Sequence, residues 1–421
     1  MKSATRLFMA LSAVLVFLAI NPPAFSALVS EWKFDGDGSN EVPMRPSAVP
    51  QGDAVFYAEG GVEGGFAHIP KSSDHIRIPD SSSFHLPVSF TVMFWFRQYN
   101  DQAFYGDFVS KGDLTPGSET CNFRILRYGG ALNIRATYTG ADSGAWVPHL
   151  KVLLPFAYGR WYHVAYTKSP NRHALYANGQ LLDYAEDPEN AQTNSSPIIV
   201  GKYAVETDFD ELRIYDQAWT ANQIAGYYHR YVTAFFSNFE EDWGVDAFGR
   251  DWEWGPYAWT GVNCTGSSSP PAEPHSGSRM WGTILNGCYK NWGNNSGYAE
   301  CKNDSQADDS RLRFRVDLRG MSTATLTWWE WFDVHQPYDW AEVYVDGNVV
   351  HQYCSPNYHA PDSWRFQSVD LTPYVGGWVV ITFHMMASTV IERGGWWIDD
   401  LLVIGKSALS GVLPSIFILL D

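Results

Sequence analysis

The sequence predicts an all-β protein made of two tandem antiparallel β-sandwiches of the jelly-roll type. Aromatic residues make up 16% of the chain and charged residues only 18%, a balance that favours strands over the charged surface helices of a cytosolic enzyme. Short apolar segments alternate with glycine, proline and asparagine turns, as expected for sandwiches rather than for alternating strands and helices. With 421 residues, the chain is long enough for two or three domains.

The first 26 residues have the pattern of a secretory signal peptide. Lys2 and Arg6 precede the apolar run Leu7–Ile20, and Ala24 and Ser26 place small residues before the expected cleavage site. A membrane anchor is the alternative, but the run is too short to span a bilayer comfortably. We therefore expect cleavage after Ser26 and a secreted or cell-surface protein whose mature chain does not insert into a membrane.

The first unit, residues 27–230, reads as short strands with one helix. Thr220 is placed to cap a helix because apolar residues follow it one turn apart. A glycine turn at 129–130 predicts a hairpin. The expected elements are strands at Ser89–Arg97, Asn122–Tyr128, Ala131–Thr137, Trp161–Lys168 and Ala174–Ala177 and a helix at Ala221–Tyr228.

A short link at about 230–234 is expected to lead into the second unit, residues 235–405. This unit begins near Phe235 and contains a long stretch rich in glycine, proline and serine, Gly255–Ser278. The strands expected after it are Leu312–Val316, Thr325–Phe332, Glu342–Val345, Val349–Tyr353, Trp364–Leu371, Trp378–Met385 and Trp396–Ile404. Residues 406–421 form an apolar tail that is too short to span a membrane and is consistent with a truncated domain or a sorting signal.

Four segments of the first unit, in the right order, resemble the LamG-like (concanavalin A-like) jelly roll. They are the opening strand Leu28–Asp35, the strand Phe90–Phe96, the strand pair Gly159–Ala165 with Leu175–Gly179, and the closing segment Asp210–Ile224. The resemblance implies a sandwich whose first and last strands lie side by side.

The second unit resembles the MAM-like jelly roll that accompanies secreted metallopeptidases of the immune inhibitor A type. The likeness is carried by Phe239–Glu240, His275–Thr283, Tyr338–Gly347 and Gly395–Leu401. The chain contains no His-Glu-x-x-His motif, so the peptidase activity of that family is not expected here.

Five cysteines follow the predicted signal peptide, and an exported chain can oxidise them. Cys264, Cys288, Cys301 and Cys354 suggest two disulfides, and Cys121 is left over. Three pairings are possible. We favour Cys288–Cys301 with Cys264–Cys354, because the first pair would close the Gly/Asn-rich loop 291–297. Zinc is the alternative, but neither C-x-x-C nor H-x-x-x-H spacing occurs.

Acidic residues near the first and last strands suggest structural calcium. Adjacent acids on a strand point to opposite faces, so one of the pair at 399–400 must turn inward, where an unpaired charge is costly. A hard divalent cation would satisfy it through oxygen ligands. The expected ligands in the second unit are Glu240 and Asp399, and the MAM-like resemblance adds Asp339. In the first unit they are Asp35 and Asp210. The alternative is that these acids face solvent.

Two further patterns have competing interpretations. Glu206, Asp208 and Asp210 alternate and would share one strand face, which could supply a glycosidase's carboxylates, although Leu212 occupies the position where a further acid is needed. In Trp328–Phe332, alternation sends Trp329 and Trp331 to one face. These rings could form sheet core or a sugar-stacking platform beside Trp252, Trp254 and Trp259.

We therefore predict a secreted, non-catalytic recognition or adhesion protein that binds glycans or extracellular proteins and carries structural calcium. The formal net charge of −17 argues against a nucleic-acid partner. The alternatives are a secreted glycoside hydrolase or polysaccharide lyase on a concanavalin-like fold, or a structural accessory of a cell-surface complex. The fold alone does not decide among these functions.

Overall fold

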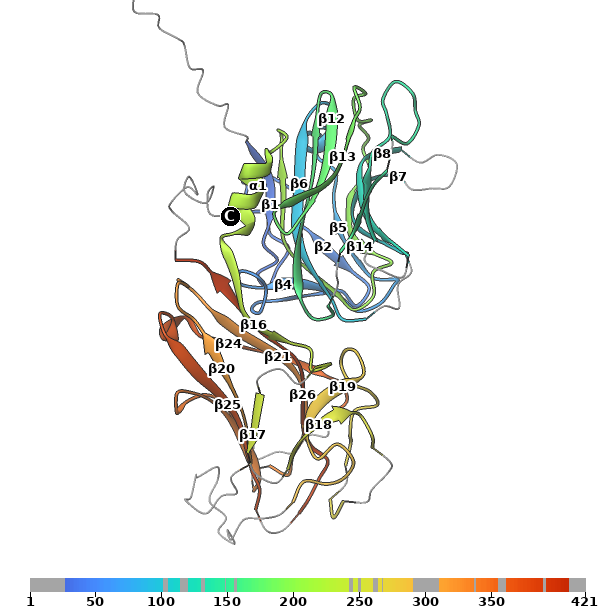
Figure 1. The fold of residues 1–421 in the computed structure, drawn as a ribbon. Coiled ribbons are helices and arrows are strands. Elements are labelled where there is room, and N and C mark those ends of the chain that lie inside the picture. Colours follow the sequence, from blue (N-terminus) through green and yellow to red (C-terminus); the bar gives the residue numbers. More distant parts are fainter. Residues whose placement is uncertain are drawn as a thin grey trace, which may run out of the picture.

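The computed structural model describes residues 27–100, 105–113, 120–129, 133–147, 149–154, 157–241, 245–248, 251–259, 264–266, 268–290, 310–336, 338–354, 361–388 and 391–408. The predicted signal peptide, Cys301 and most of the apolar tail lie outside the described residues. As predicted, the fold is nearly all-β, and antiparallel strands form two sandwiches in sequence (Figure 1).

The first sandwich contains an eight-stranded and a seven-stranded sheet. The eight-stranded sheet has the order β13-β12-β11-β6-β15-β4-β3, with β1 beside β15. Its strands are β1 (Leu28–Trp32), β3 (Val55–Tyr57), β4 (Phe66–Ile69), β6 (Phe90–Gln98), β11 (Trp161–Ser169), β12 (Arg172–Ala177), β13 (Gln180–Glu186) and β15 (Thr207–Tyr215). The seven-stranded sheet has the order β10-β9-β8-β7-β14-β5-β2. Its strands are β2 (Val49–Gln51), β5 (His75–Ile78), β7 (Tyr105–Asp113), β8 (Thr120–Tyr128), β9 (Asn133–Thr137), β10 (Leu150–Leu153) and β14 (Ile198–Lys202).

The outer face of the eight-stranded sheet is covered along strand β6. Phe94 and Phe96 lie in the core between the two sheets, as strand alternation requires. Met93 and Trp95 face the other way and are also buried, in a cluster with α1 (Ala221–Tyr228) and β26 of the second unit. The eight-stranded sheet therefore has no open face along β6.

The predicted helix and hairpin are both confirmed. Thr220 accepts a hydrogen bond from the backbone of Gln223, whose side chain accepts one from the Thr220 backbone, a capping box that fixes the start of α1. Strands β8 and β9 pair antiparallel, as the hairpin requires. Two short 3₁₀ turns complete the helical elements of the described residues, Ser82–Phe84 and Thr372–Tyr374.

The second sandwich contains a six-stranded and a five-stranded sheet. The six-stranded sheet has the order β18-β19-β26-β21-β24, with β16 beside β26. Its strands are β16 (Tyr231–Ser237), β18 (Trp252–Pro256), β19 (Arg279–Thr283), β21 (Thr325–Asp333), β24 (Arg365–Asp370) and β26 (Gly395–Lys406). The five-stranded sheet has the order β17-β20-β25-β22-β23. Its strands are β17 (Val245–Phe248), β20 (Ser310–Asp317), β22 (Trp340–Val345), β23 (Asn348–Tyr353) and β25 (Trp378–Met386).

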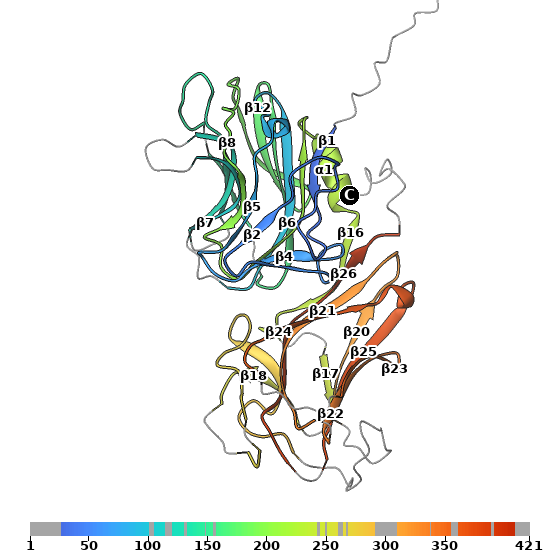
Figure 2. The ribbon, with the colours of Figure 1, turned by 180° about the vertical axis from the view of Figure 1, so that it is seen from behind.

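The two units are joined without a free linker. Tyr231 pairs with Lys406 at the start of β16, so most of the expected link at 230–234 is a strand of the second sandwich. The six-stranded sheet lies against the outer side of the eight-stranded sheet, as Figures 1 and 2 show from opposite sides. No helix among the described residues has the length and hydropathy needed to span a membrane.

Candidate functional site

The most promising surface for a ligand is the outer face of the seven-stranded sheet. This sheet lies on the side of the first sandwich away from α1 (Figures 1 and 2). Strand alternation places Phe123, Ile125, Ile134 and Ala136 in the core, so the residues between them, Arg124 and Arg135, point outward.

Strand register aligns the outward residues in two rows, which we call the open face. Arg77 and Lys151 in these rows are exposed, Arg124 is 12% exposed, and most of the shorter side chains in the rows are buried. In the first row, Arg77, Ile199, Ser110, Arg124 and Thr137 lie opposite one another in turn. In the second row the same holds for Lys202, Asp107, Leu126, Arg135 and Lys151. Five of these ten residues are cationic and one is acidic, whereas the whole chain has a net charge of −17. The open face is thus a local concentration of positive charge.

An ion pair lies at the centre of the open face. Arg124 Nε donates to Asp107 Oδ1 at 2.8 Å, and the Asp107 side chain is 0% exposed. The guanidinium centre of Arg124 lies 5.4 Å from the Tyr105 ring centroid and 5.8 Å from that of Trp146, within the range of cation–π attraction. Burial raises the pKa of the Asp107 carboxyl to about 7, and Lys202 opposes this shift.

Arg135 repeats the stacked arrangement one strand further on. Its guanidinium centre lies 3.8 Å from the Tyr128 ring centroid, and its buried Nε atom has no hydrogen-bond partner among the described residues. Tyr128 and Tyr203 are 39% and 46% exposed, and both rings contact Tyr105. The open face therefore combines exposed aromatic rings with two stacked guanidinium groups, and that of Arg135 keeps a donor without a partner among the described residues.

The pKa of His149 reflects the same concentration of charge. Burial lowers the pKa of His149, and Arg135, Arg124 and Lys151 lower it further. The His149 ring also contacts Trp146. Sequence reasoning did not identify this site, because only the strand register brings β7 to β10 into line. The available signal was the alternation of arginine with core residues in 123–127 and 134–136.

The predicted ligands Asp35 and Asp210 face one glycine-rich loop of the first unit. Asp210 Oδ2 accepts hydrogen bonds from the backbone of Val62 at 2.6 Å and Glu63 at 3.3 Å, and Asp35 Oδ1 accepts one from Gly65 at 2.5 Å. Asp210 Oδ1 is buried and has no partner among the described residues. Burial raises the pKa of Asp210 well above its usual value, with Glu211 and Asp35 adding to the shift. This pair fits a cation that would supply the missing partner.

Glu240 and Asp399 have the same arrangement in the second unit. Asp399 Oδ2 accepts from the Ser276 backbone at 3.0 Å, and Glu240 Oε1 accepts from the Ser278 backbone at 2.8 Å. Asp399 is fully buried, and burial together with Asp400 and Glu240 raises its pKa well above its usual value. Both carboxylates thus face one short segment, as the pair in the first unit does.

Asp339, the third expected ligand, has different partners. It accepts hydrogen bonds from the Tyr289 hydroxyl and from the Ser388 backbone at 2.5 Å. No set of three or more His, Cys, Asp or Glu side chains in the described ranges is placed to hold a metal ion. A cation at either acidic pair would therefore need backbone or water oxygens as further ligands.

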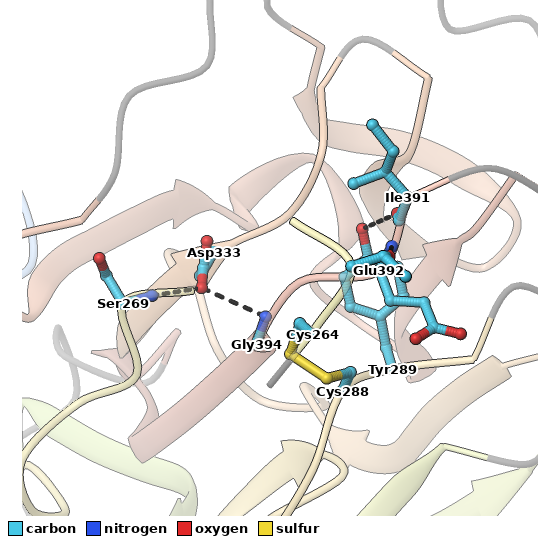
Figure 3. The surroundings of a disulfide bond; sticks show 9 residues. Cys264, Ser269, Cys288, Tyr289, Asp333, Ile391, Glu392 and Gly394 are labelled. Carbon is cyan, nitrogen blue, oxygen red and sulfur yellow. Dashed lines mark hydrogen bonds between the residues drawn. A yellow bond between two sulfur atoms is a disulfide. The ribbon is translucent and has the colours of Figure 1, made fainter. Parts of the chain in front are cut away.

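The preferred disulfide pairing was wrong. Cys264 is bonded to Cys288, with the Cα atoms 5.6 Å apart (Figure 3). Cys354 is also disulfide-bonded. Near the Cys264–Cys288 bond, the Asp333 carboxylate at the end of β21 accepts hydrogen bonds from the Ser269 and Gly394 backbones (Figure 3). The spacing of the cysteines did not show that the Gly/Pro/Ser-rich stretch is tied to Cys288 by this disulfide.

Asp208, one of the alternating acids, lies in a closed charge network. It accepts from His68 at 2.7 Å, Arg97 at 2.8 Å and Tyr99 at 2.8 Å, and it is 0% exposed. Burial alone would raise the pKa of Asp208, but Arg97 and the bond from His68 bring it below its usual value. Glu206 precedes β15, and its carboxylate lies 3.6 Å from the other ring nitrogen of His68. Glu206 and Asp208 therefore share one histidine, whereas Asp210 bonds the backbone of the loop at 62–63.

The aromatic strand β21 alternates as predicted, but both of its faces are occupied. Trp328 lies in the core of the second sandwich, and Trp329 contacts His68 and Tyr99 of the first unit. Trp331 contacts Trp364. Of the loop tryptophans, Trp252 is buried, Trp254 Nε1 donates to the Phe239 carbonyl and Trp259 packs on Trp397. The rings thus serve packing more than an exposed platform.

A hollow of about 310 Å³ lies where the two units meet. Its charges pair with one another, since Lys406 bonds Glu63 and Arg213 bonds Glu31, both at 2.5 Å. Its lining residues are Glu31, Lys33, Glu41, Glu63, Arg213, Arg230, Tyr231 and Lys406. Because its ion pairs already satisfy many of these groups, we regard it as part of the junction.

Residues 70–225 match the family described as the concanavalin A-like lectin/glucanases superfamily, Laminin_G_3. The chain is 25% identical over 197 residues to Bacillopeptidase F of Bacillus subtilis (strain 168), a match that covers 46% of this chain and 12% of that protein. Most of the length of that relative therefore lies outside the match.

Two solved structures show partial similarity. Domain 4 of AbnA, an extracellular GH43 arabinanase from Geobacillus stearothermophilus solved with arabinotriose, has a TM-score of 0.37 and 20% identity, covering 48% of this chain and 97% of that chain. The receptor-binding domain of botulinum neurotoxin mosaic serotype C/D has a TM-score of 0.42 and 10% identity, covering 72% and 73%. The family match, together with the two sheets described above, makes residues 70–225 a concanavalin A-like domain.

Proposed function

We propose that the protein is a secreted, non-catalytic recognition protein that binds glycans on the open face. The observation that carries the proposal is the combination of exposed tyrosine rings with stacked guanidinium groups on the sheet face away from α1. Flat aromatic rings pack on the apolar faces of sugars, and a few oriented polar groups then set specificity. The concanavalin A-like family match supports the same class of ligand.

Carboxylate placement favours binding over hydrolysis. A glycosidase places two carboxyl groups about 5 to 10 Å apart on either side of the scissile bond. The two rows of the open face contain one carboxylate, Asp107, and it is buried and bonded to Arg124. Asp208 is enclosed by Arg97, His68 and Tyr99. These positions do not offer a substrate a pair of accessible acids.

A glycan array tests the proposal. We expect the mature chain to bind a subset of saccharides and Tyr203→Ala to weaken that binding. The matched control is Tyr184→Ala, because Tyr184 is 52% exposed but lies on β13 of the other sheet. A chain that binds no saccharide, or equal losses in the two variants, would overturn the proposal.

We also propose structural calcium at the two acidic pairs and a MAM-like identity for the second unit. In both units, acids that follow the opening strand and lie on the closing strand converge on one loop. The residue before each first acid has a left-handed backbone, with φ of 59° at Phe34 and 58° at Phe239. This shared arrangement supports a common structural role, and the orphaned Asp210 oxygen supports a bound cation.

A further inference from the structure

We infer that the open face selects acidic glycans, whose carboxylate or sulfate groups bind Arg124 and Arg135 while their sugar rings lie on the neighbouring tyrosines. The inference rests on the glycan-binding function proposed above and names the class of ligand. Three features support the inference. They are the geometry of the two guanidinium groups, the charge of the open face, and the set of neighbouring tyrosine rings.

Both guanidinium groups are held in place by neighbouring rings. Arg135 stacks on Tyr128 at 3.8 Å and leaves Nε without a partner among the described residues. Arg124 lies near both Tyr105 and Trp146 and uses Nε and Nη2 on Asp107. A planar guanidinium binds carboxylate or sulfate oxygens in pairs, and stacking lowers the entropy lost when it does so.

The charge of the open face favours an anion. Its two rows bring Arg77, Arg124, Arg135, Lys151 and Lys202 together against Asp107. Neutral sugars do not need such an excess, and like charges on neighbouring strands disfavour folding unless something offsets them. An acidic saccharide would neutralise the positive charges that the single carboxylate of Asp107 does not balance.

The remaining surface argues for a short acidic glycan rather than a nucleic acid. The net charge of −17 means that the rest of the chain would repel a long polyphosphate. An oligosaccharide contacts only the open face. Tyr105, Tyr128 and Tyr203 form a connected set of rings, with Tyr105 in contact with the other two, and such a set suits consecutive sugar rings.

Calorimetric titration of the mature chain tests the inference. The probes are oligogalacturonate, its carboxyl-reduced counterpart, a sulfated oligosaccharide and single-stranded DNA, which separate carboxylate, neutral, sulfate and phosphate ligands. The test variant is Arg135→Gln, because Arg124→Gln would leave Asp107 buried and unpaired. The matched control is Arg172→Gln, whose guanidinium lies 3.9 Å from the Tyr184 ring on the other sheet of the same sandwich.

We expect an acidic probe to bind the wild type at least about tenfold more tightly than the carboxyl-reduced probe, as one charge-assisted contact allows. Arg135→Gln should remove most of that preference, and Arg172→Gln should preserve it. Equal affinity for acidic and neutral probes would overturn the inference and leave the proposed function standing. Binding to neither would also overturn the inference, and the glycan array described above would then decide the proposed function. Single-stranded DNA that binds as tightly as the acidic probes would show general polyanion capture and also overturn the inference.

Discussion

His275 of the second unit and Tyr99 of the first meet edge to face, with ring centroids 4.6 Å apart. His275 also stacks on Trp329 at 4.0 Å and bonds Asp400 at 2.7 Å. Tyr99 in turn donates to Asp208. A continuous set of buried contacts thus runs from one sandwich into the other, and the two units should unfold together rather than as independent domains.

Gly60→Ala tests this coupling. Gly60 has a φ of +91°, and a Cβ atom there would lie 2.3 Å from the Phe366 ring of the second unit. We expect a loss of about 2 to 4 kcal/mol in the free energy of unfolding, because the overlap adds to the backbone cost. Urea unfolding followed by tryptophan fluorescence measures this loss.

Gly376→Ala is the control for Gly60→Ala. Gly376 has a similar φ of +97°, but a Cβ atom added there would have no other atom within 4 Å. We expect it to cost about 1 to 2 kcal/mol from the backbone alone. Equal losses in the two variants would mean that the Phe366 contact contributes nothing.

The outcome of each sequence prediction depended on how local its signal was. The Thr220 cap and the β8–β9 hairpin were predictable because each depends on residues close in sequence. Alternation also placed Trp328 and Trp329 on opposite faces. It could not show that Trp329 packs against His68 of the other unit, a contact between residues more than 200 positions apart.

The same limit applies to the binding surface and the cysteines. Arg124 and Arg135 are ordinary strand residues until the register places them beside Tyr105 and Tyr128. The disulfide prediction was based on the composition of one loop, whereas the tertiary fold brings Cys264 next to Cys288. Sequence patterns therefore predicted the elements, and long-range packing decided which residues share a surface.

Removal of the Cys264–Cys288 disulfide should destabilise the second unit. The two cysteines are 24 positions apart, and closing a loop of that size is worth about 3 kcal/mol in the unfolded chain. We expect Cys264→Ser/Cys288→Ser to lower the free energy of unfolding by that amount in urea. Peptide mapping without reductant should recover the 264–288 pair, and recovery of a 288–301 pair instead would contradict the structure.

Binding of oligogalacturonate should strengthen as the pH falls. Burial raises the pKa of Asp107 to about 7, and the charged groups that face it are Arg124 from β8 and Lys202 from β14. Below that pH, Asp107 is protonated and no longer neutralises Arg124. Galacturonate stays ionised from about pH 8 to about pH 6. Burial and the neighbouring cations lower the pKa of His149, which opposes protonation of that ring.

Titrations at about pH 8 and about pH 6 should therefore differ in affinity by at most about tenfold per pH unit, the limit for one linked proton. Asp107→Asn should bind with the same affinity at both values, near the low-pH affinity of the wild type. A pH dependence that persists in Asp107→Asn would assign the effect to another group.

Calcium should raise the melting temperature of the mature chain. A cation that binds only the folded state stabilises it by mass action. In the first unit, such a cation would bond the buried Asp210 oxygen, which has no partner among the described residues. We expect a higher melting temperature in calcium than in chelator, and a smaller effect of magnesium, which demands a tighter octahedral site. Asp210→Asn and Asp399→Asn should each remove part of the calcium-induced rise in melting temperature.

Asp339→Asn is the control, because Asp339 bonds Tyr289 and Ser388 rather than the loops that the acidic pairs face. It should lower the melting temperature in both buffers and leave the calcium shift unchanged. Wild-type melting curves that coincide in calcium and chelator would exclude a structural calcium site at either pair.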